Sequence, residues 1–149
     1  MKILPNVNNG KLFEAVHYVI FSGGKRFRAF LTLQSAKLFD VPQEKALQAA
    51  SAVELIHAYS LVHDDLPSMD NDDLRRGKPT VHVKWDEATG ILVGDGLQAF
   101  AYEVLCKKET HDDPAVRLHL VRELARAAGF HGMVLGQAKD LEAESLLRN

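Results

Sequence analysis

Apolar residues recur at the three- and four-residue spacing of amphipathic helices through most of the chain, and β-branched runs are scarce. Glycines and prolines interrupt this pattern at a few points and divide it into separate helices. The pattern predicts about six helices, at residues 11–21, 25–39, 43–65, 87–108, 115–128 and 132–147. The long connection 66–85 is expected to be irregular, and long loops in compact domains tend to be functional. We therefore expect an all-α fold.

Five aspartates and two adjacent arginines lie within residues 63–77, around the end of the third expected helix. Carboxylates this close repel one another, so such a cluster persists best when a divalent cation occupies it. Mg²⁺ prefers oxygen ligands and typically uses one or two carboxylates together with phosphate oxygens of a substrate. Arg75 and Arg76 suit the phosphate, because a guanidinium forms paired hydrogen bonds with it. The segment therefore indicates a diphosphate site.

The acidic segment has two other possible interpretations. Acid-rich stretches beside arginine pairs are usually solvated surface loops. A calcium-binding EF-hand loop needs acidic residues at alternating positions, a glycine at the sixth position and a terminal glutamate. Pro67 and Met69 interrupt the alternation, and neither glycine nor glutamate stands where that loop needs it, so we do not expect calcium.

The third expected helix carries a histidine and the first aspartates on one face. His57 precedes Asp64 by two helical turns, which separates them by roughly 10 Å along that face. Pro67 ends the regular hydrogen-bond ladder, so Asp70 is expected to reach back from a distorted turn.

A second charged cluster lies upstream, at residues 22–28. Gly23 and Gly24 permit a sharp turn, and Lys25 and Arg28 share a face of the next helix. A compact lysine charge and a planar arginine together suit a diphosphate. Taken alone this pattern is weak, because most basic tetrapeptides are solvated helix starts and this one lacks P-loop spacing.

Five motifs follow one another along the chain: Gly23-Gly24-Lys25-Arg26-x-Arg28, residues 54–65, residues 70–77, Gly94-Asp95 and Gly136-Gln137-x-x-Asp140-Leu141. In order and spacing they resemble the trans-isoprenyl diphosphate synthase (polyprenyl synthetase) family, most nearly its bacterial farnesyl diphosphate synthase type. The resemblance implies an isoprenoid-synthase-type helical bundle. This chain would supply a partial bundle, as a single incomplete all-α domain over residues 1–149.

The resemblance also implies the chemistry: a prenyltransferase that condenses isopentenyl diphosphate with an allylic diphosphate, dimethylallyl or geranyl, to give farnesyl diphosphate. Mg²⁺ assists ionisation of the allylic substrate, condensation follows, and a proton is lost to the released diphosphate. The residues implied on the metal and allylic side are Asp64 and Asp70 as Mg²⁺ ligands, Asp65 in support, Arg75 beside the departing diphosphate, and Gln137 with Asp140 as further contacts.

The residues implied for the diphosphate of isopentenyl diphosphate are Lys25, Arg28, His57 and Arg76. Product length is expected to depend on Tyr59, which stands where farnesyl synthases of the family carry an aromatic stop. Ser60 faces Asp64 more directly on an ideal helix, and a tyrosine that only packs the core is an open alternative.

Other functions stay open at this point. A geranylgeranyl or other chain-length synthase would carry the same motifs. A terpene cyclase would not need Lys25, Arg28 and His57 as a separate diphosphate site, and a non-catalytic subunit usually loses the aspartate-rich motif that is intact here.

The chain lacks motifs that the family carries in its later half: a second aspartate-rich motif, a Lys-Thr pair and a Phe-Gln pair. Family members are about twice as long and usually have another helix before the Gly-Gly-Lys motif. We expect the 149 residues alone to be inactive. Two interpretations of the length stay open: the sequence is a fragment of a longer protein, or the gene product is short.

The remaining features point to an ordinary protein of the cell interior. A net charge of −2 creates no field that favours nucleic acid or an anionic membrane. No apolar stretch reaches membrane-spanning length and no signal-peptide pattern opens the chain, so a cytoplasmic location without stable membrane insertion is expected. The family resemblance adds a homodimer as the expected assembly.

Several residues near the motifs are expected to be structural. Cys106 lies at the end of an apolar helical run and is expected to be buried and inert. His63 points about 100° away from Asp64 on a helix and is left out of the site. Close helix packing is the expected reason for three glycines in the fourth long helix: Gly90, Gly94 and Gly96.

Overall fold

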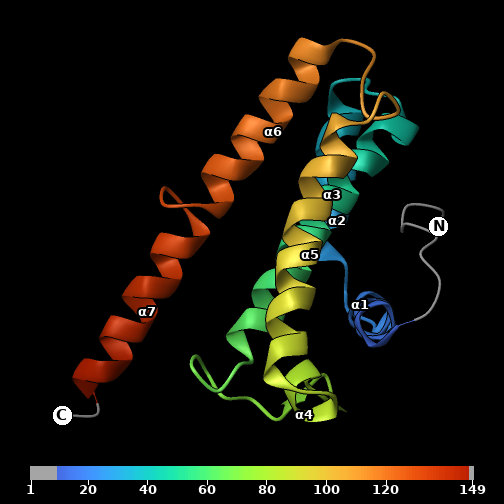
Figure 1. Cartoon of the computed structure of the whole chain (residues 1–149). Helices are drawn as coiled ribbons and strands as arrows, with labels where there is room; N and C mark the ends of the chain where they lie inside the picture. The colour runs from blue at the N-terminus through green and yellow to red at the C-terminus, as the bar shows by residue number, and fades with distance from the viewer. Residues whose placement is uncertain (1–9, 148–149) are drawn as a thin grey trace.

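The computed structural model describes residues 10–147 and consists almost entirely of helices packed side by side (Figure 1). The elements are α1 (Lys11–Phe21), α2 (Phe27–Leu38), α3 (Gln43–Asp64), β1 (Leu74–Arg75), β2 (Lys78–Pro79), α4 (Val81–Lys84), α5 (Glu87–Cys106), α6 (Pro114–Ala128) and α7 (Met133–Leu147). The all-α expectation is confirmed. The connection after α3 is more regular than expected, because it contains a two-stranded hairpin and the one-turn helix α4.

The core lies mainly between α3 and α5, which run alongside each other in the centre of the molecule (Figure 1). The largest fully buried side chains, Val93, Leu97 and Val104, all belong to α5. Burying an aliphatic side chain of this size contributes about 1.5–3 kcal/mol, so this seam is the best stabilised part of the bundle. Helix α2 packs on α3, and α1 packs on both α3 and α5.

Two glycines let α5 approach its neighbours closely. A Cβ at Gly90 would lie 3.0 Å from Cδ2 of Leu66, and a Cβ at Gly94 would overlap the imidazole of His63. A Cβ at Gly96 would meet no heavy atom within 4 Å. The expectation of close packing is therefore confirmed at Gly90 and Gly94 and wrong at Gly96.

Aspartates cap the N-termini of α5 and α6. Asp86 accepts a hydrogen bond from the backbone N–H of Thr89 at 2.7 Å, and it also pairs with Lys11 Nζ at 2.6 Å. Asp113 accepts from the backbone N–H of Ala115, next to Pro114 in the first turn of α6. Such caps satisfy N–H groups that a helix start leaves without a partner.

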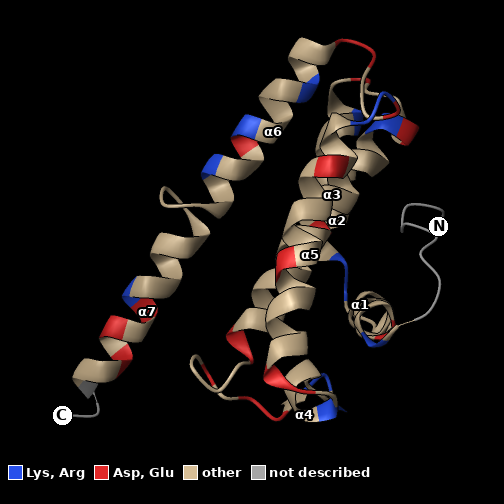
Figure 2. Cartoon of the chain, viewed as in Figure 1, with Lys and Arg blue, Asp and Glu red and all other residues tan. Residues whose placement is uncertain are grey.

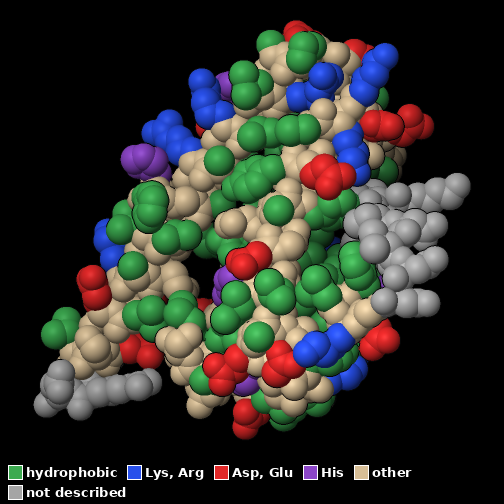
Figure 3. Space-filling view, viewed as in Figure 1, with side chains coloured by type: hydrophobic (Ala, Val, Ile, Leu, Met, Phe, Trp, Pro, Cys, Tyr) green, Lys and Arg blue, Asp and Glu red, His purple; other side chains and the backbone are tan. Residues whose placement is uncertain are grey.

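Helices α6 and α7 form a second, diagonal pair that diverges from α5 toward the carboxyl end (Figure 1). Hydrophobic side chains gather over α5 and the facing side of this pair (Figure 3), and Phe130 between α6 and α7 is exposed. Cys106 is exposed at the last position of α5, so its expected burial is wrong. Within residues 10–147 no helix is long and apolar enough to cross a membrane.

Candidate functional site

The acidic end of α3 is shaped by a loop that turns back on the helix. The backbone N–H of Asp70 donates to the carbonyl of Asp64 at 2.9 Å, and that of Asp72 donates to the carbonyl of Asp65 at 3.2 Å. Pro67, placed just past the helix, supplies no N–H and helps to end the helical ladder. Asp70 therefore returns to Asp64, as the distorted turn predicted, and Figure 2 shows acidic residues concentrated along this end of the bundle.

Asp64 and Asp70 interact through their charges as well as their backbones. The pKa of Asp64 is raised, first by partial burial and then by the negative charge of Asp70. Gln137 on α7 donates from Nε2 to Asp64 Oδ1 at 2.6 Å, which brings the last helix to the end of α3. Asp140, one turn further along α7, is exposed and has no hydrogen bond or ion pair with this cluster within residues 10–147.

The carboxylates fit a cation that arrives together with a phosphate ligand. Within the described residues no group of three or more His, Cys, Asp and Glu side chains is arranged to hold a metal ion. Asp64 and Asp70 form a close pair of like charges, and a divalent cation between them would relieve the repulsion that raises the pKa of Asp64. Two carboxylates plus waters and phosphate oxygens are a typical Mg²⁺ ligand set.

Asp65 points away from this pair and is buried, with 4% of its surface exposed. Arg75 Nε donates to Asp65 Oδ1 at 2.5 Å, and Arg75 Nη2 donates to Asp72 Oδ2 at 3.1 Å. Burial raises the pKa of Asp65, although Arg75 opposes that effect. Arg75 thus binds the hairpin to the end of α3 and is not a free phosphate fork in this structure; its contact with a diphosphate stays a prediction.

The hairpin directs a second arginine toward the glycine turn. Its strands pair Leu74 with Pro79, and the two-residue turn Arg76-Gly77 has φ angles of +56° and +75°, as a type I′ turn requires. Arg76 Nη1 donates to the carbonyl of Gly23. Gly24 has a φ of +125°, a conformation that favours glycine, and the Arg76 guanidinium occupies the space that a Cβ would take, with Cζ 2.7 Å away.

An open groove of about 630 Å³ lies where α1, α2, α3 and the hairpin meet. All four residues expected at the isopentenyl diphosphate site line it: Lys25, Arg28, His57 and Arg76. Arg28 Nη1 lies 3.3 Å from His57 Nε2. Burial and then the Arg28 charge lower the pKa of His57, so its imidazole is neutral at neutral pH. Arg26 also lines the groove, which therefore carries four permanent cations, and Arg26 is the one that pairs with Glu54.

Sequence reasoning missed two residues that shape this groove. Glu54 accepts from the backbone N–H of Ala29 at 3.0 Å and from Arg26 Nη1 at 3.2 Å. Arg26 also donates to the carbonyl of Ile20. Together they fix the first turn of α2, which carries Arg28. Glu54 lies one turn before His57 on α3, and this shared face was a signal that could have identified it.

The two residues expected to control product length have different surroundings. Tyr59 belongs to the hydrophobic core with 7% of its surface exposed, and its ring meets the His63 ring edge-on at 5.6 Å between centroids. Ser60 donates to the carbonyl of His57 within its own helix at 3.0 Å. Both the core-packing interpretation and the length-setting one remain compatible with Tyr59.

Comparisons with known proteins agree with this geometry. The family model described as polyprenyl synthetase matches residues 9–148. Farnesyl diphosphate synthase of Haemophilus influenzae is 48% identical over 137 residues, which covers 92% of this chain and 46% of the relative. Geranylgeranyl pyrophosphate synthase 4 of Arabidopsis thaliana is 46% identical over 146 residues, covering 98% of this chain and 39% of the relative.

A solved structure has the same arrangement of helices. The apo structure of an FPP/GFPP synthase from Zymomonas mobilis matches with a TM-score of 0.92 and 52% identity, over 96% of this chain and 52% of that one. The chain thus spans about half the length of the proteins that it resembles.

Proposed function

Because the chain belongs to the polyprenyl synthetase family, we propose that it supplies the first aspartate-rich site and the second diphosphate site of a prenyl diphosphate synthase. One observation carries the proposal: a groove lined by four cationic side chains lies beside an acidic helix end, both built on α3. A smaller cavity of about 60 Å³ is lined by His57 and Arg76 from the groove and by Asp65 and Arg75 from the acidic end. The two regions are therefore neighbours, as two reacting diphosphates require.

On the acidic side, Asp64 and Asp70 would hold a divalent cation beside the allylic diphosphate, and their ligand chemistry favours Mg²⁺. When bound, the cation neutralises the negative charge that develops on the departing diphosphate. Gln137 orients Asp64 through its 2.6 Å hydrogen bond. Asp65 is a supporting residue that keeps the hairpin, and with it Arg75, against the end of α3.

On the basic side, Lys25, Arg28 and Arg76 bind the diphosphate of isopentenyl diphosphate by charge, and neutral His57 adds a hydrogen bond. The C–O bond of the allylic substrate breaks, and its electron pair leaves with the diphosphate. The double bond of isopentenyl diphosphate then attacks the allylic cation and forms the new C–C bond. A proton passes to the released diphosphate, so no protein base is required.

We propose farnesyl diphosphate as the product, with Tyr59 as the side chain that stops chain growth. Relatives of similar identity are named as farnesyl and as geranylgeranyl synthases, so overall identity does not fix the product length, which is measured directly.

The decisive experiment incubates the protein as its gene encodes it with labelled isopentenyl diphosphate, Mg²⁺ and either dimethylallyl or geranyl diphosphate. We expect a fifteen-carbon diphosphate from both primers. Asp64→Asn is expected to abolish product. Asp40→Asn is the matched control, because Asp40 is exposed after the end of α2 and lies outside the acidic segment, and this variant is expected to keep the activity. No condensation product from either primer contradicts the proposal.

A further inference from the structure

The functional proposal leaves two motif elements without a role: His63, which precedes the metal-binding aspartate, and the Gly94-Asp95 pair of α5. They are far apart in the sequence, yet the structure brings them together. His63 leaves α3 about 100° from Asp64, and that direction faces α5.

The imidazole of His63 lies in a notch of α5. Its Nε2 is 3.0 Å from the backbone carbonyl of Ile91, and because a carbonyl only accepts, Nε2 carries the proton. Gly94 forms the floor of the notch, since a Cβ there would lie 2.7 Å from Cε1 of the ring and still closer to Nε2. Asp95 Oδ1 lies 4.0 Å from Nε2 at the rim.

The notch belongs to a rigid part of α5, and the end of α3 packs against it. Val93 and Leu97, on either side of Gly94, are fully buried in the core. The regular helix α3 ends at Asp64, and N–H groups of the following loop bond its last carbonyls, as Asp70 does for Asp64. The direction of this final turn therefore depends on its contacts with the loop and with α5. The His63 contact attaches this final turn to the best packed helix.

We propose that His63 is a positioning residue, which locks the last turn of α3 into the Gly94 notch and thereby aims the Asp64 carboxylate at the metal-bound diphosphate. Gln137 restrains the same carboxylate from α7, so Asp64 is oriented from two helices. We call this contact between His63 and the Gly94 notch the His63 joint. Tyr59 contacts it as well, because its ring meets the His63 ring edge-on. The inference rests on the proposed function, because it assigns an orienting partner to that site.

The test uses paired variants in the protein as its gene encodes it. Gly94→Ala fills the notch, and Gly96→Ala is its matched control, because it adds the same methyl group two residues on in α5 where nothing lies within 4 Å. His63→Phe keeps a ring and removes the N–H, whereas His63→Gln restores an N–H donor at similar reach.

We expect Gly94→Ala and His63→Phe to raise the Mg²⁺ concentration for half-maximal rate and the KM for the allylic diphosphate by about tenfold or more, the range seen when a partner of a metal ligand is lost. The KM for isopentenyl diphosphate should change by less than about twofold. Gly96→Ala should match the unaltered protein, and His63→Gln should recover most of the loss. Folded Gly94→Ala and His63→Phe variants with unchanged Mg²⁺ dependence overturn the inference, as does an equal rise of both KM values.

A second measurement separates this inference from the functional proposal. Mg²⁺-dependent binding of inorganic diphosphate, followed by calorimetry, needs no prenyl transfer. If the unaltered protein binds diphosphate but forms no product, the functional proposal fails, and the positioning role of His63 can still be tested. Weaker diphosphate binding by Gly94→Ala than by Gly96→Ala then supports the positioning role of His63, and equal binding overturns it.

Discussion

Removal of the Arg75 side chain is expected to destabilise the protein even when no substrate is present. Asp65 is 4% exposed, and its carboxylate receives Arg75 Nε at 2.5 Å. Arg75→Ala leaves this buried charge without its counter-charge, a change that costs about 3–5 kcal/mol when both partners are deeply buried. The Arg75 side chain is 31% exposed, so water reaches the pair and we expect about 2–3 kcal/mol.

The loss is measured by thermal and urea unfolding without metal or diphosphate. For a chain of this size it corresponds to a fall in Tm of about 5–10 °C. Asp65→Asn in the Arg75→Ala background removes the unpaired charge and should recover much of the loss, so the double-mutant cycle should give a coupling of about 2 kcal/mol.

The matched control is Arg122→Ala on α6. Arg122 pairs with Glu123 at 3.0 Å, but the two side chains are 68% and 48% exposed, so the change should be within about 0.5 kcal/mol. If Arg75→Ala melts like the unaltered protein, or if Asp65→Asn restores nothing, then the Asp65–Arg75 pair does not hold the hairpin and our reasoning is refuted.

Four further predictions follow from the site and the fold. Inorganic diphosphate should raise Tm in Mg²⁺ and not in EDTA, and equal stabilisation in EDTA would contradict a metal-bridged site. Arg28→Ala should raise the KM for isopentenyl diphosphate about tenfold or more, since a charged contact is worth about 1.5–3 kcal/mol, whereas Lys37→Ala, also exposed on α2, should not. Tyr59→Ala should lengthen the product chain, and an unchanged product distribution removes Tyr59 as the stop. The pKa of Asp86 is lowered from 3.8 to about 2, so its carboxylate stabilises the fold above about pH 4, and this stabilisation is lost as the pH falls through about 2. The Tm of Asp86→Asn should therefore lie below that of the unaltered protein above pH 4 and approach it as the pH falls to 2, and a constant difference would refute the assignment.

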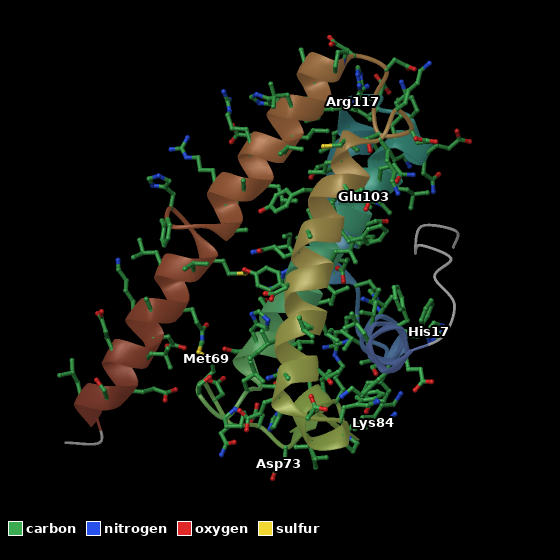
Figure 4. The ribbon with its side chains drawn as sticks, in the orientation of Figure 1. His17, Met69, Asp73, Lys84, Glu103 and Arg117 are labelled. Carbon is green, nitrogen blue, oxygen red and sulfur yellow. The ribbon has the colours of Figure 1, made fainter. Side chains whose placement is uncertain are left out.

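Local sequence patterns predicted only part of the structure of the loop between α3 and α5. Pro67 and the acidic spacing predicted a turn that brings Asp70 back to Asp64, and the backbone hydrogen bond between them bears this out. The hairpin was not predicted, although Arg76-Gly77 occupies its turn with two positive φ angles. A two-residue strand has too few side chains to show alternation, so periodicity could not reveal it. Figure 4 shows the result, with Met69 on the side of the loop toward α7 and Asp73 at the foot of the molecule.

The wrong expectations share a cause. Cys106 follows an apolar run and is exposed at the last position of α5, although Leu105 beside it is buried in the core. Gly96 was grouped with Gly90 and Gly94, yet it faces outward on the helix. Hydrophobicity and residue type identify a helix, but the elements that pack against it determine which of its residues are buried.

The sequence by itself determined the helical class, the extent of most helices, and the residues that gather in the basic groove and at the acidic end of α3. These depend on spacing within one helix or one loop, which backbone geometry makes regular. The tertiary structure alone decided that Arg75 pairs with buried Asp65, that Glu54 holds the first turn of α2, and that His63 enters the Gly94 notch. Such contacts join side chains on separate elements, and their partners depend on how the packed helices are rotated and offset, which no local pattern specifies.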